Sequence, residues 1–124
     1  IGHGISSIDD PALLAHLHAH NVVLDISPSS NVCTGAVPTI EAHPLRRLYD
    51  AGISITLNTD DPTFFKTTLN DEYRLAARVF GFDAGELAQL ALNAARAPFL
   101  PEAERVALLE RVETELAALR DIVE

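Results

Sequence analysis

Two adjacent carboxylates give the strongest chemical signal in this 124-residue sequence. Asp60 and Asp61 follow an apolar run that ends at Leu57, and Pro62 comes directly after them. Ligands of α/β proteins bind beyond the carboxyl ends of parallel strands, and neighbouring side chains on an extended segment point in different directions. One carboxylate could therefore ligate a cation while the other accepts a hydrogen bond from a substrate. The alternative is an Asx turn that ends the strand.

The first histidine has a similar placement. His3 lies between Gly2 and Gly4, just after an apolar residue. Small neighbours let a ligand approach the backbone closely, which suits a binding site at a strand end. Taken alone, His3 is more simply interpreted as a loop histidine with open space around it.

The other histidines and the single cysteine give weaker signals. His16 and His20 share one face of an expected helix while His18 points elsewhere, so a solvated helix edge is expected rather than a metal site. His43 is expected to help start the helix that follows it. Cys33 has no nearby partner and is expected to be unreactive.

The elements that position these groups alternate between helix and strand. The expected order is a helix over 11–20, a strand over 22–26, a long loop over 27–39, a helix over 44–52, a strand over 53–57, and helices over 68–81, 83–94 and 101–123. This alternation predicts parallel strands joined by helical crossovers. Two strands are too few for a sheet, and only the segment at Ile1 offers a third. Residues 29–31 of the long loop (Ser-Ser-Asn) lie beyond a strand end, where ligand contact is possible.

Helix starts are marked by local capping signals. Asp10 followed by Pro11 is a typical start, and the helix after them is expected to bury Leu13, Leu14 and Leu17. Capping boxes are expected from Thr68 with Asp71 and from Asp83 with Glu86.

The composition argues against several classes of partner. Eighteen acidic and nine basic residues give a net charge of −9, so binding to nucleic acid or to an anionic membrane surface is not expected. No apolar run approaches the ~20 residues of a membrane span, and no signal-peptide pattern opens the chain. A single cysteine fits a reducing compartment, so a cytoplasmic location is expected.

Several short strings form an ordered series along the chain. They are Ile-Gly-His-Gly at 1–4, Ser-Pro-Ser-Ser-Asn at 27–31, His-Pro-Leu at 43–45 and Leu-Asn-Thr-Asp-Asp-Pro at 57–62, followed by Thr68-Leu69 and Glu72-Tyr73. Together they resemble the adenosine deaminase family of zinc hydrolases. The resemblance implies an α/β fold, the C-terminal part of a (β/α)8 barrel.

Within that barrel, the resemblance makes residues 1–124 the C-terminal segment of a single domain. The stub before Gly4 would end strand six, 22–26 and 53–57 would be strands seven and eight, and 101–124 would form a C-terminal helix packed on the barrel. A full barrel needs about 250 residues, so the N-terminal half of the barrel is expected to be absent from this chain and to be its partner. The lack of any Met fits this expectation.

The resemblance also implies the chemistry. Asp60 would be the carboxylate ligand of one catalytic zinc ion, Asp61 would hydrogen-bond a purine ring nitrogen, and His3 would contact the attacking hydroxide and stabilise its developing charge. Zinc lowers the pKa of bound water to about 7, which makes hydroxide available at neutral pH. The expected function is hydrolytic deamination of a purine nucleoside, adenosine or aminodeoxyfutalosine, to an inosine-type product and ammonia. The sequence does not separate these substrates from adenine itself.

The rest of the family's zinc site is missing from the sequence. Neither the His-x-His pair of the first strand nor the His-Ala-Gly-Glu segment is present, and one carboxylate cannot hold zinc tightly. Residues 1–124 alone are therefore expected to be inactive.

Two other classes of function stay open at this point. One is a non-catalytic helical interaction protein whose acidic C-terminal helix, with an apolar stripe over 106–123, docks on a partner. The other is a calcium or magnesium site at Asp60 and Asp61, although hard cations need about six oxygen ligands. The enzyme interpretation makes a spatial prediction that separates it from the interaction protein, because it requires His3 and Asp60 to converge on one cavity.

Overall fold

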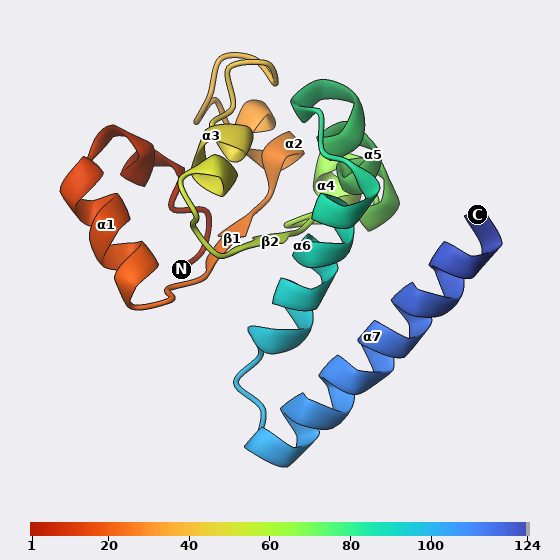
Figure 1. Ribbon diagram of the computed structural model, residues 1–124. Helices are drawn as coiled ribbons and strands as arrows, with labels where there is room; N and C mark the ends of the chain where they lie inside the picture. The colour runs from red at the N-terminus through yellow and green to blue at the C-terminus, as the bar shows by residue number, and fades with distance from the viewer. Residues whose placement is uncertain (124) are drawn as a thin grey trace.

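Two short parallel strands lie at the centre of the protein (Figure 1). In the computed structural model, which describes the backbone of residues 1–123 and the side chains of residues 1–119, β1 (Leu24–Ile26) pairs in parallel with β2 (Ile55–Leu57). Each strand begins two residues later than expected and ends at the expected residue. The predicted parallel arrangement is confirmed.

The N-terminal segment adds a third, shorter parallel stretch beside β1. Gly2 forms a parallel bridge with Asp25. The Asp25 N–H donates to the Ile1 carbonyl at 2.9 Å, and the His3 N–H donates to the Asp25 carbonyl at 2.8 Å. Because all three segments run in the same direction, their carboxyl ends meet at one edge of the sheet.

Helices cover the strands and bury them. All three residues of β2 are buried, as expected for a strand covered on both faces. Helix α1 (Pro11–Ala19) lies on one side of the strands in Figure 1 and α6 (Ala84–Arg96) on the other. Leu17 of α1, Leu48 of α3 (Leu45–Asp50) and Leu90 of α6 join the strand side chains in one core.

The predicted helix starts are confirmed, but one predicted core position is wrong. The Asp10 carboxylate accepts hydrogen bonds from the first N–H groups of α1, and both capping boxes form, at α5 (Leu69–Phe80) and at α6. Leu17 is buried and Leu14 partly so, whereas Leu13 is 41% exposed. Leu13 and Leu14 lie on opposite sides of Leu17 around the helix, at about 100° per residue, and the core covers only the side that carries Leu14.

Two short helices were not predicted from the sequence. Helix α2 (Pro28–Cys33) occupies much of the predicted loop 27–39, and α4 (Pro62–Phe65) follows the aspartate pair directly. Each begins with a proline at its first position, where the missing N–H is harmless and φ is already set. Helices of six and four residues are too short to leave a periodic apolar stripe in the sequence, so the loop prediction for residues 28–33 is wrong.

The longest helix, α7 (Glu102–Val123), runs back alongside α6 (Figure 1). Val106 and Leu119 of its predicted apolar stripe are exposed. The Val123 side chain and the residue Glu124 lie outside the part of the chain that the structure describes. None of the described helices combines the length and hydrophobicity needed to cross a membrane.

Candidate active site

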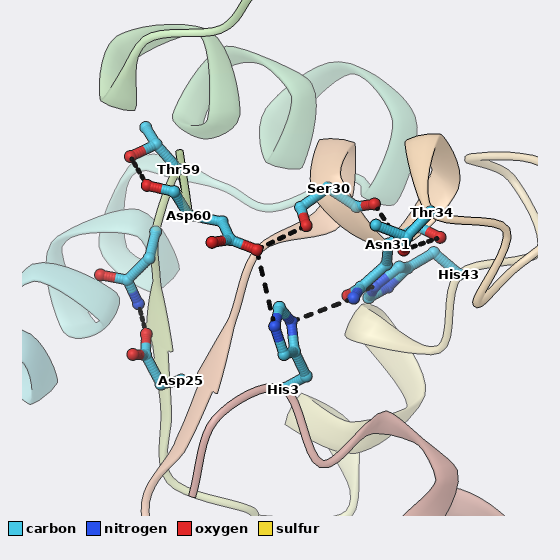
Figure 2. Close-up of polar contacts among 9 residues, drawn as sticks. His3, Asp25, Ser30, Asn31, Thr34, His43, Thr59 and Asp60 are labelled. Carbon is cyan, nitrogen blue, oxygen red and sulfur yellow. Dashed lines mark hydrogen bonds and ion pairs between the residues drawn. The ribbon is translucent and has the colours of Figure 1, made fainter. Parts of the chain in front are cut away.

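His3 and Asp60 face each other at the carboxyl ends of the parallel segments (Figure 2). His3 Nε2 lies 3.6 Å from Asp60 Oδ2, and both side chains line one cavity of about 580 Å³. The predicted convergence of these two residues is confirmed. This arrangement supports the enzyme interpretation and has no explanation in the interaction-protein interpretation.

Both residues have left-handed backbone conformations, with φ of 56° for His3 and 57° for Asp60. Among the described non-glycine residues, only Asn21 and Lys66 also have positive φ, and both follow the end of a helix, where such conformations are common. His3 and Asp60 end no helix. Unusual backbone conformations held in this way cluster at functional sites.

The Asp60 carboxylate is oriented by α2. The Ser30 hydroxyl donates to Asp60 Oδ2 at 2.7 Å, while Oδ1 has no hydrogen-bond partner among the described residues. The side chain is 39% exposed and faces the cavity. A carboxylate with one free oxygen and a neighbour that fixes its orientation suits a zinc ligand. No three His, Cys, Asp or Glu side chains gather into a metal site within the described residues.

The other ring nitrogen of His3 begins a chain of hydrogen bonds that runs through the buried residues Asn31 and His43 (Figure 2). His3 Nδ1 lies 3.0 Å from Asn31 Nδ2, Asn31 Oδ1 lies 2.9 Å from His43 Nε2, and the Leu45 N–H donates to His43 Nδ1 at 3.0 Å. Asn31 and His43 are buried. Burial lowers the pKa of His43 from 6.5 to about 4, so its ring is neutral at physiological pH.

Asp61 has a local partner of its own. Its Oδ1 accepts a hydrogen bond from the Phe64 N–H at 2.8 Å and caps the start of α4. Asp61 is exposed and, unlike Asp60, does not line the cavity that His3 lines. Asp61 Oδ1 thus makes the local contact that the turn-forming alternative requires. The predicted hydrogen bond from Asp61 to a substrate stays a prediction.

Sequence reasoning missed the buried acid that supports α2. Glu72 of α5 is only 1% exposed. Its Oε1 accepts from the Thr67 hydroxyl at 2.6 Å, and its Oε2 accepts from the Ser29 N–H at 3.2 Å. Glu72 entered the sequence series only as part of a string. At about 100° per residue it lies about 40° from the buried Ala76 around α5, and this spacing is the signal that could have indicated its burial.

A second polar group lies on the strands themselves. Asp25 Oδ1 accepts from the Thr56 hydroxyl at 3.2 Å and also from the Asn58 amide. Asn58 and Asp25 line a small pocket that also contains His3 and Asp60. No signal in the sequence singled out Asp25, because an acidic residue inside an apolar strand has no local pattern.

The remaining histidines and the cysteine lie away from the cavity. His16, His18 and His20 are exposed, as predicted for a solvated helix edge. His18 Nδ1 lies 2.7 Å from the Gly52 carbonyl, and the rings of His16 and His20 stack with centroids 4.1 Å apart. Cys33 is a free, exposed thiol.

Comparison with known proteins identifies the relatives of this chain. The family model described as adenosine deaminase matches residues 1–115. The aminodeoxyfutalosine deaminase of Streptomyces avermitilis is 45% identical over 118 residues, which are 95% of this chain and 33% of that protein. The adenine deaminase of Sinorhizobium medicae is 45% identical over 109 residues, 88% of this chain and 34% of that protein. The chain therefore spans about a third of the length of the curated relatives it matches.

Solved structures agree with these matches. An adenine deaminase from Arthrobacter aurescens superposes with a TM-score of 0.87 at 32% identity, over 94% of this chain and 36% of that one. An amidohydrolase from Burkhoderia ambifaria with bound zinc gives a TM-score of 0.87 at 27% identity, over 98% and 34% of the two chains. These similarities confirm the predicted fold class, a mixed α/β chain that forms part of a (β/α)8 barrel.

Proposed function

Because the chain belongs to the adenosine deaminase family, we propose that it forms one side of the active site of a zinc-dependent hydrolase that removes the amino group of an adenine-type ring. The observation that carries this proposal is the 3.6 Å approach of His3 and Asp60 across one cavity. Three segments distant in sequence supply these side chains and the Ser30 hydroxyl that orients Asp60.

Each residue has a role that suits its surroundings. Asp60 would be the carboxylate ligand of one zinc ion, with Ser30 holding the carboxylate in place. A bound zinc ion would supply Lewis-acid activation of water, with which hydrolysis of the amino group can begin. His3 would stabilise the negative charge that the water oxygen acquires as it loses its proton. Asp61 Oδ1 caps α4 and its Oδ2 has no hydrogen-bond partner among the described residues, so Oδ2 would accept a hydrogen bond from the purine ring.

The relatives narrow the class of substrate. The two proteins compared above are named as deaminases of aminodeoxyfutalosine and of adenine, and a related Arabidopsis protein has been crystallised with IMP. All three ligands share a purine base or its deaminated form. We therefore assign an adenine ring as the reacting group and a purine nucleoside, adenosine or aminodeoxyfutalosine, as the preferred substrate.

The test uses the protein at its natural length, with zinc content and ammonia release measured on the same samples. Asp60→Asn should lose both zinc and turnover, because an amide is a poor zinc ligand. His3→Gln should keep zinc and lose about 10²–10³-fold in kcat. Glu104→Gln, an exposed carboxylate on α7, is the matched control and should change neither. Full zinc content and turnover in Asp60→Asn would overturn the proposal.

A further inference from the structure

One backbone N–H group determines which atom donates and which accepts in each hydrogen bond of the chain from His43 to His3. The Leu45 N–H can only donate, and it points at His43 Nδ1 from 3.0 Å. Nδ1 of His43 must therefore accept and carries no proton. Burial keeps this ring neutral by lowering its pKa, so its single proton lies on Nε2.

The proton on His43 Nε2 then determines the orientation of the Asn31 amide. His43 Nε2–H must donate to whichever Asn31 atom faces it, and only the amide oxygen can accept. The orientation of the amide follows from the network, with its NH2 group facing His3. The reverse orientation would set two N–H donors against each other in a buried place, which costs about 1–3 kcal/mol.

The last step of the chain sets the proton on His3. The Asn31 NH2 group donates to His3 Nδ1 across 3.0 Å, so Nδ1 accepts and a neutral His3 ring carries its proton on Nε2. Nε2 is the nitrogen that faces Asp60 across the cavity. Their separation of 3.6 Å is too long for a direct hydrogen bond, which leaves the N–H available to a ligand.

We propose that Asn31 and His43 are positioning residues that hold His3 as the Nε2–H tautomer, so that His3 presents a hydrogen-bond donor to the reacting oxygen. The role in catalysis rests on the proposed function, because a donor stabilises developing negative charge. In the opposite tautomer Nε2 would present a lone pair to the same oxygen and repel it. The backbone at the start of α3 thus determines the chemistry of a residue more than forty positions earlier.

Nitrogen-15 NMR of the histidine rings tests the proposal without any activity measurement. The natural-length protein is labelled with 15N-histidine and observed at about pH 8, above the ordinary titration range of histidine. The His3 signals are identified by their loss in His3→Gln. In the wild-type protein, His3 should show a protonated Nε2 and an unprotonated Nδ1.

Four variants separate positioning from simple structural support. Asn31→Asp keeps the shape of the side chain but cannot donate, so Nδ1 of His3 should become protonated and kcat should fall about 10²-fold or more with KM little changed. His43→Gln keeps a donor toward Asn31 and should preserve the tautomer, whereas His43→Leu should not. His18→Gln, on the exposed edge of α1, is the control and should leave the His3 signals unchanged.

The outcomes divide cleanly between this role and the proposed function. A wild-type His3 protonated on Nδ1, or an Asn31→Asp protein that keeps the Nε2–H tautomer, would overturn the positioning role even if the enzyme is active. If the tautomers behave as expected but no deaminase activity is found, the proposed function fails and the structural relay stands. Should Asn31→Asp not fold, the wild-type spectrum and the two His43 variants decide the question.

Discussion

Glu72 offers a sharp test of how the site is supported, because it joins α5 to the helix that carries Ser30 and Asn31. It accepts one hydrogen bond from the Thr67 hydroxyl at 2.6 Å and one from the Ser29 N–H at 3.2 Å. The first distance is typical of a hydroxyl that donates to an ionised carboxylate. Replacing Glu72 should therefore loosen the start of α2 before it affects any other element.

The size of the effect follows from the partners that each replacement leaves behind. Glu72→Leu removes both acceptors. The half-buried Ser29 N–H then loses its side-chain partner, and the buried Thr67 hydroxyl keeps only the Thr68 carbonyl at 3.4 Å, at about 1–3 kcal/mol each. Its cost should be about 2–5 kcal/mol in the free energy of unfolding. Glu72→Gln can accept from Ser29 and donate to the Thr67 hydroxyl, so it loses mainly the charge assistance, about 1 kcal/mol.

Urea denaturation measures this difference directly. With a slope of about 2 kcal/mol/M, Glu72→Leu should lower the midpoint by about 1–2.5 M and Glu72→Gln by about 0.5 M. Glu104→Leu and Glu104→Gln repeat the substitutions at an exposed position and should stay within about 0.5 kcal/mol of wild type. A Glu72→Leu protein with the midpoint of its Glu104 counterpart, or a Glu72→Gln protein as unstable as Glu72→Leu, would refute this account of the support.

Acid should destabilise the protein through His43. Between pH 6.5 and about 4, His43 binds a proton in the unfolded chain but stays neutral in the folded protein. The free energy of unfolding should therefore fall as the pH drops through this range, by up to about 3 kcal/mol. Denaturation against pH should show this loss in wild type and less of it in His43→Gln; equal pH profiles would contradict it. Gly4→Ala should cost about 1–3 kcal/mol, because its φ is 67° and the new Cβ would lie 2.8 Å from Leu24 Cδ2, whereas Gly2→Ala meets no atom within 4 Å. Thermal unfolding should rank the two variants in that order, and a reversed order would be inconsistent with the packing. Polypeptide 1–124, purified alone, should hold far less than one zinc ion per chain by elemental analysis, and one tightly held ion would show that other ligands exist.

Much of the fold could be predicted because its signals are local. The carboxyl ends of both strands follow from short β-branched runs, and the starts of α1, α5 and α6 follow from capping residues next to each helix. Counting strands indicated a third strand at the N-terminal segment, because two strands are too few for a sheet, and the structure shows that this segment pairs with β1. His3 and Asp60 could be named because each lies within a few residues of a strand end.

The supporting network could not be predicted, because its contacts cross long distances in sequence. Asn31 lies 28 positions from His3 and 12 from His43, and Ser30 lies 30 positions from Asp60. The sequence indicated one half of the His43 role, its contact with the start of α3, which the Leu45 N–H confirms. Its second nitrogen acquires a role only when α2 forms, and α2 was missed because six residues carry no periodic stripe.

The hydrogen bonds of this network offset the backbone strain of the left-handed conformations at His3 and Asp60. A left-handed conformation costs a non-glycine residue about 1–2 kcal/mol, and glycine at either position would remove that cost together with the functional side chain. The His3 N–H is held by the Asp25 carbonyl and its ring by Asn31, while the Asp60 carboxylate is held by Ser30. Hydrogen bonds of about 1 kcal/mol each, stronger where a charge takes part, are enough to offset the strain. The two strained residues therefore face each other because side chains of α2 hydrogen-bond to both of them. The geometry of the site thus depends on this short helix.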